Sequence, residues 1–323
     1  MRRGALGLVV GVAAASAGAV PALAQQPQPQ PPPQPQPPPA PAAGQMTLAV
    51  PGTIVVHGRP YALTGDTVTV RGRVTPYVPG QTVRVRISTP KRKPTVVRTR
   101  IGKGGAFQVR FRTRRAVRYK IYARHAATPE QAVFAARGVV KVVAPGQRMA
   151  VVLLKQGLRA LGYPAGNGPA VTDKLGRSVL AFRKTNGLAR VATADRTIYE
   201  MVFARRGAFK LRYPKAGRHV EADLSRQVVV LADNGKPVAT YPTSSGAPAT
   251  PTVLGHYHFY LKQPGTNAKQ MYMSNYFTRG YAIHGYPTVP TYNASHGCLR
   301  VPNADAVAIF NWIRIGDPIW VYA

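Results

Sequence analysis

Residues 281–301 read YAIHGYPTVPTYNASHGCLRV and contain the only cysteine of the chain, Cys298. The chain begins like an exported protein, and exported proteins normally pair their cysteines or avoid them. The thiolate is the nucleophilic form of cysteine, and a nearby imidazole promotes its formation. His296 lies two positions before Cys298, and Gly297 permits a tight turn whose N–H groups can face an oxyanion. The stretch predicts nucleophilic cysteine chemistry; the alternative is an inert buried thiol.

The order of residues in this stretch resembles the active-site signature of the L,D-transpeptidases, the YkuD-type catalytic domains of bacterial cell-wall enzymes. In that family a histidine precedes a Ser/Thr-His-Gly-Cys core, which a hydrophobic residue and Asn or Arg follow. The spacing in this chain is at the short end of the family's range. The matching residues are His284, Ser295, His296, Gly297, Cys298, Leu299 and Arg300.

The resemblance implies a peptidoglycan L,D-transpeptidase that works without a cofactor, through a thioester on Cys298. His284 would be the base, oriented by the carbonyl of Gly285. Backbone N–H groups around His296, Gly297 and Cys298 would hold the oxyanion, and Arg300 would pair with a substrate carboxylate. The partners would be peptidoglycan stem peptides and glycan. Further residues that would line the cleft are Ser295, Tyr281 and Tyr286.

Each of these roles has a structural alternative. His284 can be a core histidine, Arg300 a surface charge, and the two tyrosines and Ser295 ordinary packing residues. His296 can stabilise the turn as readily as it can transfer a proton. The acceptor also stays open, since a stem amine gives a cross-link, water gives an L,D-carboxypeptidase, and a protein lysine gives an anchor.

A local Cys-His-Asp triad is absent from the sequence, because no Asp or Glu lies between Asn234 and Ala304. A carboxylate can still arrive from more distant positions in the chain. The candidates are Glu221, Asp223, Asp233, Asp305 and Asp317.

Two other function classes compete with acyl transfer. His256 and His258 alternate along an expected strand, and with His284, His296 and Cys298 they can form a zinc site of a wall peptidase. The main prediction is that no metal is bound, because a nearby general-base carboxylate is missing. The third class is a non-catalytic wall-adhesion protein.

The first 45 residues predict export followed by a spacer. Residues 1–24 have two arginines, a short apolar run and Ala22-Leu23-Ala24, which is typical of a cleaved signal peptide. A retained membrane anchor is the alternative; after cleavage no stable membrane span is expected. Residues 25–45 are rich in Pro and Gln and predict an extended linker.

The rest of the chain predicts a multidomain architecture. Residues 46–144 alternate apolar and polar in short runs, which predicts an immunoglobulin-like β-sandwich. Residues 146–206 change to helical periodicity, with caps expected at Thr172 and Thr193. They resemble the three-helix peptidoglycan-binding module, and a spacer bundle is the alternative. Residues 215–323 predict a mainly-β catalytic domain, with one helix that Asn303 caps and that carries Val307, Ile309, Phe310 and Ile313.

The formal charge of +34, with only ten acidic residues, favours adhesion to a polyanion. No nucleic-acid-binding motif is visible, and nucleic acid is not expected as a partner. Anionic wall polymers are an additional candidate partner. The charge is spread along the chain, which indicates a general affinity for the wall and no particular site. The expected location is extracytoplasmic, in the cell wall or periplasm.

Overall fold

The computed structural model describes residues 40–323. The chain divides into two units, Met1–Ala40 and Pro41–Ala323, and the elements below belong to the second. The predicted signal peptide, 1–24, and the linker as far as residue 39 lie outside the described residues. In the part of the chain that is described, no helix is long and apolar enough to cross a membrane.

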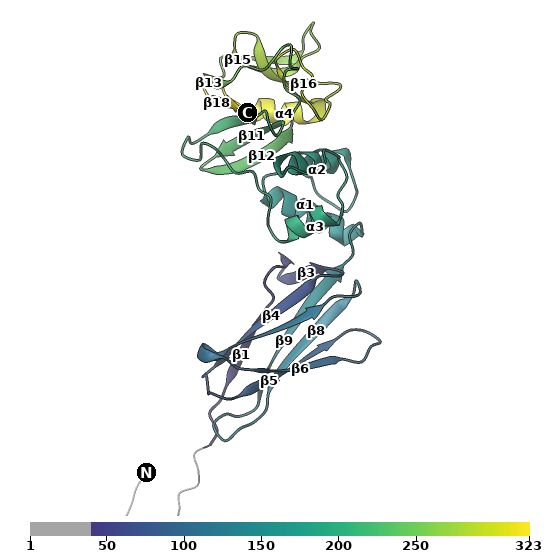
Figure 1. Ribbon diagram of the computed structural model, residues 1–323, viewed down its shortest axis with the longest axis vertical. Coiled ribbons are helices and arrows are strands. Elements are labelled where there is room, and N and C mark those ends of the chain that lie inside the picture. Colours follow the sequence, from purple (N-terminus) through teal and green to yellow (C-terminus); the bar gives the residue numbers. More distant parts are fainter. Residues whose placement is uncertain (1–39) are drawn as a thin grey trace, which may run out of the picture. The chain divides into compact units, whose positions relative to one another are not determined.

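Residues 45–143, called the sandwich below, form two sheets around one core (Figure 1). The three-stranded sheet has the order β1-β4-β7 and the six-stranded sheet has the order β2-β3-β9-β8-β5-β6. Alternating residues of both sheets, such as Val70 and Val85, are fully buried between them. The two-sheet prediction is confirmed, and a kinship with immunoglobulin domains stays a prediction. The strands are β1 (Gln45–Ala49), β2 (Ile54–Val56), β3 (Arg59–Leu63), β4 (Thr67–Thr75), β5 (Thr82–Ser88), β6 (Thr95–Arg100), β7 (Ala106–Arg112), β8 (Arg118–His125) and β9 (Phe134–Val143).

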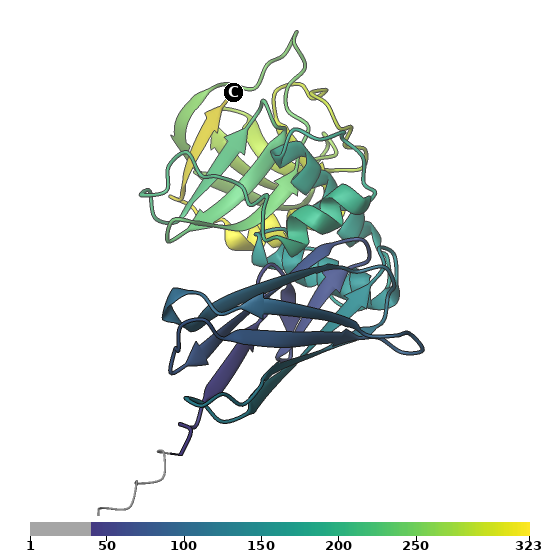
Figure 2. The same ribbon diagram turned by 60° about the horizontal axis from the view of Figure 1, so that its bottom comes forward.

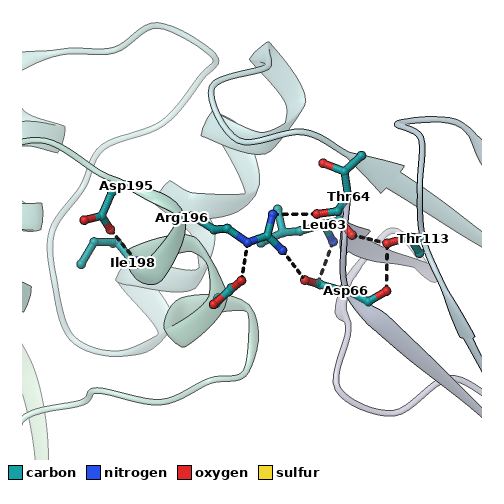
Figure 3. Close-up of polar contacts among 8 residues, drawn as sticks. Leu63, Thr64, Asp66, Thr113, Asp195, Arg196 and Ile198 are labelled. Atoms are coloured by element: carbon teal, nitrogen blue, oxygen red, sulfur yellow. Dashed lines mark hydrogen bonds and ion pairs between the residues drawn. The ribbon is translucent and has the colours of Figure 1, made fainter.

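Three helices follow, α1 (Arg148–Ala160), α2 (Asp173–Thr185) and α3 (Arg196–Phe203), called the helical segment below. Thr172 caps α2 as predicted, because its hydroxyl accepts from the N–H of Leu175 at 3.3 Å. The predicted cap at Thr193 is wrong. Asp195 caps α3 instead and accepts from the N–H of Ile198 at 3.1 Å, because only Asp195 directly precedes the first helical residue (Figure 3).

The helical segment shares a hydrophobic core with one end of the sandwich. Leu63 and Val143, from β3 and β9, belong to the same buried cluster as the inner faces of the helices. The ribbon diagram shows the helices next to the strands of the sandwich (Figure 2). Arg196 adds polar contacts, since its guanidinium donates to the carbonyl of Thr64 at 2.7 Å and to Asp66 at 3.1 Å (Figure 3). The core therefore runs across the boundary predicted between residues 144 and 146.

Residues 219–322, called the C-terminal block below, are mainly β with one helix, as predicted. A five-stranded sheet has the order β12-β11-β10-β18-β13, and a four-stranded sheet has the order β14-β15-β16-β17. One apolar core joins the two sheets and the helix α4 (Figure 1). The elements are β10 (His219–Asp223), β11 (Val228–Asp233), β12 (Lys236–Pro242), β13 (Gly255–His258), β14 (Leu261–Thr266), β15 (Tyr272–Thr278), β16 (Tyr281–Tyr286), β17 (Leu299–Pro302), α4 (Asn303–Trp312) and β18 (Pro318–Tyr322).

The predicted cap of α4 is wrong. Asn303 is the first helical residue and Pro302 precedes it as the cap position, without a capping side chain. Val307 is 39% exposed, whereas Ala306 and Ile309 face the core. Strand β17 runs directly into the helix, so the strand's direction decides where the helix begins and which face it buries.

Candidate active site

The pairing of β16 with β17 brings together residues that are far apart in the motif. The two strands are parallel, and His284 lies opposite Arg300 in the register. Ile283 and Leu299, the neighbouring pair, are fully buried in the core. Because side chains alternate across a strand, His284 and Arg300 face the other side of the sheet. Cys298 directly precedes β17, two residues before Arg300, and opens onto the same face.

These side chains line a cavity of about 440 Å³. It is formed by the ends of β16 and β17, by the turn before β17 and by the turn before β15. The lining residues are Lys269, Met271, Gly280, His284, Tyr286, Ser295, His296, Cys298 and Arg300. The structure therefore places most of the predicted site residues around one space.

The ring of His284 is held by its own neighbour. Its Nδ1 lies 2.9 Å from the carbonyl oxygen of Gly285, and the side chain is only 3% exposed. A carbonyl accepts only, so Nδ1 carries the proton and donates to it. Nε2 is then the unprotonated nitrogen of the neutral ring, and this tautomer suits a general base.

No carboxylate orients this histidine. The five acidic residues considered from the sequence do not line the cavity. Glu221, for example, accepts from the N–H groups of Arg212 and Tyr213 at 3.0 and 2.9 Å, and Asp305 pairs with Arg177 at 2.8 Å. The predicted role of the Gly285 carbonyl fits this geometry.

Burial drives the sulfur and the imidazole towards their neutral forms. Burial raises the pKa of the Cys298 thiol, against smaller lowering effects of a backbone hydrogen bond, Arg300 and Lys269. Burial also lowers the pKa of His284, which the hydrogen bond to Gly285 opposes and the charge of Arg300 reinforces. Both directions favour a neutral thiol and a neutral imidazole over a thiolate–imidazolium pair in the resting protein.

The turn before Cys298 is built around Ser295. The Ser295 hydroxyl donates to the carbonyl of Cys298 at 2.5 Å and accepts from the N–H of Gly297 at 3.0 Å. Ser295 is 1% exposed, so this hydroxyl holds the turn closed. The N–H of Gly297 was predicted to be one of the oxyanion donors, but it already donates to the Ser295 hydroxyl.

Gly297 is required in this turn for two reasons. Its φ of +113° lies in a region that other residues rarely adopt. A Cβ at this position would also lie 2.6 Å from Cε1 of Tyr281. Tyr281 does not line the cavity; its ring packs against the turn that presents Cys298.

Two cationic side chains flank the cavity. The Arg300 guanidinium lies 4.0 Å from the ring centroid of Tyr286, which also meets the His284 ring edge-on at 6.0 Å. Lys269 was not identified from the sequence, and neither was Met271. Both follow Asn267, whose carboxamide oxygen accepts from the N–H groups of Lys269 and Met271 at 3.0 Å each. An Asn-centred turn was the local signal for these residues, but only the fold shows that the turn borders the cavity.

A segment after β12 supports the turn from behind. The N–H of Ser244 donates to the carbonyl of Arg300 at 2.9 Å, and the N–H of Ser295 donates to the carbonyl of Ser245 at 2.9 Å. The Thr252 hydroxyl donates to the carbonyl of Gly297 at 2.8 Å. Residues 244–252 therefore hold the backbone on both sides of Cys298 in place.

The residues of the proposed zinc site do not assemble. His256 and His258 lie on the same face of β13, with ring centroids 5.0 Å apart, and His256 stacks on Trp320 at 4.2 Å. His284, His296 and Cys298 line the cavity, which neither of these histidines borders. Within residues 40–323, no group of three or more His, Cys, Asp and Glu side chains is placed to hold a metal ion.

Comparison with known proteins gives matches for the C-terminal block. A family model described as the L,D-transpeptidase catalytic domain, YkuD, matches residues 217–321. L,D-transpeptidase 1 of Mycobacterium tuberculosis is 27% identical over 121 residues, which cover 31% of this chain and 48% of that relative. The chain therefore spans about half the length of the curated relative that it matches.

Solved structures give matches of the same kind. A crystal structure of the L,D-transpeptidase from Xylanimonas cellulosilytica is 30% identical in sequence, with a TM-score of 0.47, and the match covers 53% of this chain and 92% of that one. An NMR structure of the catalytic domain of the Enterococcus faecium L,D-transpeptidase, acylated by ertapenem, is 24% identical, with a TM-score of 0.29. That match covers 33% of this chain and 97% of the other.

Proposed function

Residues 217–321 belong to the L,D-transpeptidase catalytic family, and from this premise we propose that the protein cross-links peptidoglycan stem peptides through a thioester on Cys298. The observation that carries the proposal is the parallel register of β16 and β17. In this register His284 lies opposite Arg300, and Cys298, which precedes β17, lines the same cavity of about 440 Å³. A nucleophile, a base and a cation at one cavity suit acyl transfer from a carboxylate-bearing peptide.

In the first half-reaction, Cys298 replaces a D-amino acid. Nε2 of His284 takes the thiol proton while Sγ attacks the carbonyl carbon that joins an L-centre to the D-residue. The tetrahedral intermediate collapses, and the C–N bond breaks as the imidazolium returns the proton to the leaving amine. The D-amino acid departs and a thioester stays on Sγ. A neutral thiol and a neutral imidazole in the resting protein suit this order of steps, because the proton moves only when the substrate is in place.

The second half-reaction reverses the proton path. An amine of a neighbouring stem peptide attacks the thioester carbonyl and loses a proton to His284. The C–S bond breaks, the proton returns to Sγ, and a new amide cross-links the two stems. Water in place of the amine would give a carboxypeptidase, and the cavity residues do not choose between these acceptors.

We propose that the backbone N–H groups of His296 and Cys298 donate hydrogen bonds to the oxyanion of the tetrahedral intermediate. The remaining N–H in the turn, that of Gly297, is already bonded to Ser295. Each donor to an oxyanion is typically worth about 3 kcal/mol of transition-state stabilisation. Arg300 and Lys269 would attract the carboxylates of the donor stem peptide.

The other parts of the chain are proposed to serve the same reaction in the wall. Binding of glycan by the helical segment, spacing by the sandwich and extracytoplasmic location are proposals that follow from the family of residues 217–321. We propose no metal-dependent step, because the cysteine and the histidine suffice for the chemistry.

The test is acylation of purified protein by ertapenem, since carbapenems acylate the cysteine of the resembled family. Intact-mass spectrometry should show one adduct on the wild-type chain, and peptide mapping should place it on Cys298. The Cys298→Ala variant should give none, and His284→Gln should react at least ~100-fold more slowly. A matched control is His256→Gln, which changes a histidine of the same block outside the cavity and should react at the wild-type rate.

A second readout addresses the natural reaction. Muropeptides from cells that make the wild-type protein should contain L,D-cross-links, and those from cells with only Cys298→Ala should lack them. Wild-type protein without an ertapenem adduct, or L,D-cross-links that survive in the variant, would remove the basis of the proposal.

A further inference from the structure

The charge of the sandwich is organised by the strand register. Between residues 41 and 144 the sequence has 20 Lys and Arg but only two acids, Asp66 and Glu130. On strands β5, β6, β8 and β9 the exposed basic residues alternate with residues that face the core, so they emerge on the outer face of the six-stranded sheet. We call the central part of this surface the cationic face, defined by Arg84, Arg86, Arg98, Lys120, Arg124 and Arg137.

Three arginines of this face form a row across neighbouring strands. Arg84 on β5 lies directly opposite Arg98 on β6 and directly opposite Arg124 on β8. Directly opposite side chains in an antiparallel sheet have Cβ atoms only about 5 Å apart, and like charges at that distance destabilise the sheet. The arginine row (Arg98, Arg84 and Arg124) is therefore a cost to the free protein.

The next row adds two more cations. Arg86 lies opposite Tyr122, which in turn lies opposite Arg137, and the Arg137 guanidinium lies 5.8 Å from the centroid of the Tyr122 ring. The two rows are separated by two residues along each strand, about 7 Å. The cationic face is thus a grid of fixed charges and not a single pocket.

No acidic side chain of residues 40–323 neutralises this grid. Within residues 40–323, none of the ion pairs involves a residue of the cationic face. Asp66 is bonded to Arg196 of the helical segment, and residues 1–39 contain no acid at all. Six exposed cations without a partner on one rigid sheet are complementary to a polymer of regularly spaced anions.

We propose that the cationic face binds a linear, base-free polymer whose units are joined by phosphodiesters, outside the cell membrane. The guanidinium fork of arginine fits two oxygens of a phosphate, and several weak contacts along one polymer add up by multivalency. Single-stranded nucleic acid is disfavoured, because the face has only one aromatic ring on which a base could stack, Tyr122, and that ring lies against Arg137. The choice of an extracellular polymer rests on the proposed function; the binding itself does not.

Inorganic polyphosphate is the probe, as a linear phosphate polymer without bases. The row variant is Arg84→Gln, Arg98→Gln and Arg124→Gln together. The control variant is Arg71→Gln, Arg73→Gln and Arg110→Gln together, on the outer face of the three-stranded sheet. It removes the same charge, but each of its arginines lies opposite a neutral residue: Gln108, Ala106 and Thr69.

Wild-type protein should bind long-chain polyphosphate at 0.15 M salt. The row variant should bind at least ~30-fold more weakly, with a slope of log affinity against log salt that is smaller by about two to three. The control variant should lose less than ~3-fold. Both variants should react with ertapenem at the wild-type rate, so a failure of this surface is separate from a failure of the proposed acyl transfer.

Thermal stability provides a second test of the arginine row. At low salt the row variant should have a higher Tm than wild type, and a larger gain than the control variant, because it removes directly opposed charges. Equal losses of affinity in both variants, or no binding of polyphosphate by wild type, would overturn the proposal. Tighter binding of single-stranded DNA or of vesicles with 30% phosphatidylglycerol than of polyphosphate would assign the face to a different partner and overturn it as well.

Discussion

At the residue scale, the geometry of the site depends on two small residues that carry no chemistry of their own. Gly285 offers its carbonyl to Nδ1 of His284 at 2.9 Å. A Cβ on Gly285 would lie 2.6 Å from Oδ1 of Asn303 and 2.8 Å from Cβ of Ala306, at the start of α4. A larger residue would push helix and strand apart, so glycine allows α4 to pack directly behind the histidine.

The other small residue is Gly297, and its replacement by alanine should disable the site. The substitution forces φ near +113° on a residue with a Cβ and drives that Cβ into Tyr281. We expect a loss of about 1–3 kcal/mol of unfolding free energy and at least ~100-fold slower acylation by ertapenem.

The control for that experiment is Gly280→Ala. Gly280 also lines the cavity, but a Cβ there would meet nothing within 4 Å. Thermal unfolding and acylation rates of the two variants should therefore differ clearly. Equal behaviour of both would mean that the turn tolerates a side chain.

The pKa directions at the site predict the pH dependence of acylation. His284 must be neutral to accept a proton, and burial lowers its pKa below the ordinary 6.5. Lowering the pKa extends the neutral form to lower pH, so the acid limb of kcat/KM should have its midpoint below 6.5. A pH profile measured with a neutral thioester or amide substrate checks this, and a midpoint above 7 would contradict it.

The thiol gives a separate measurement of the same site. Burial raises the pKa of Cys298 above the ordinary 9.0, so the free protein should hold little thiolate at neutral pH. The rate of alkylation by iodoacetamide should rise with pH to a midpoint above 9.0. A midpoint well below 9.0 would indicate a preformed thiolate–imidazolium pair.

At the element scale, helix α2 reaches into the C-terminal block. Lys184, 2% exposed, donates to the carbonyls of Thr243 at 2.7 Å and Gln227 at 3.3 Å. The Thr243 hydroxyl in turn donates to the carbonyl of Arg300 at 2.7 Å. A chain of hydrogen bonds therefore runs from the helical segment to the strand that follows Cys298.

Lys184 should make the stability of the protein depend on pH. Burial, with a smaller contribution from Arg190, lowers its pKa to about 7 from 10.5. Between these values the unfolded chain binds a proton that the folded chain does not, so this contribution to stability grows as the pH rises. The Lys184→Met variant lacks it.

The measurement is the difference in unfolding free energy between wild type and Lys184→Met, at pH 7 and at pH 9.5. The difference should shift in favour of wild type at the higher pH. The control is Lys174→Met on the same helix, where the side chain is exposed and the difference should stay constant. A difference for Lys184 that does not change with pH would show that the lysine is not buried in the folded protein.

At the scale of the whole molecule, the predicted domains depend on one another. Leu63 of the sandwich packs into the core of the helices, the N–H of Thr240 donates to the carbonyl of Gly162 at 2.7 Å, and Arg177 of α2 pairs with the buried Asp305. The predicted boundaries at residues 144–146 and 206–215 are therefore both crossed by buried contacts.

Successive truncations from the N-terminal side should remove these contacts one boundary at a time and lower the Tm. We expect Tm to fall from the chain 41–323 to 146–323, and again to 215–323, and ertapenem acylation to slow most at the last step, when α2 is lost. Buried polar groups left without partners cost roughly 1–3 kcal/mol each. Full stability and reactivity of 215–323 would show instead that α2 is a separate module.

Much of this organisation is local and could be predicted from the sequence. The strict alternation of apolar and polar residues along β4, β5 and β7 is a local signal for strands, because one face of each strand must be buried. Asn234-Gly235 is a local signal for the hairpin between β11 and β12, because both residues readily adopt positive φ, and here φ is 49° and 70°. The motif around Cys298 predicted a nucleophile and its base within one short stretch, and both Cys298 and His284 line the cavity, while their catalytic roles stay predictions.

Other features required the tertiary structure, because they depend on contacts between distant segments. The parallel register of β16 and β17 puts His284 and Arg300 side by side, and the turn at Asn267 brings Lys269 to the cavity. Strand pairing also decides how the positive charges are arranged in space. The arginines are spread out along the sequence, whereas in the sheet Arg98, Arg84 and Arg124 lie in one row. Composition and short motifs determined which kind of chemistry this chain has the residues for. Long-range pairing decided which side chains meet, because a strand register depends on two segments and cannot be deduced from either segment alone.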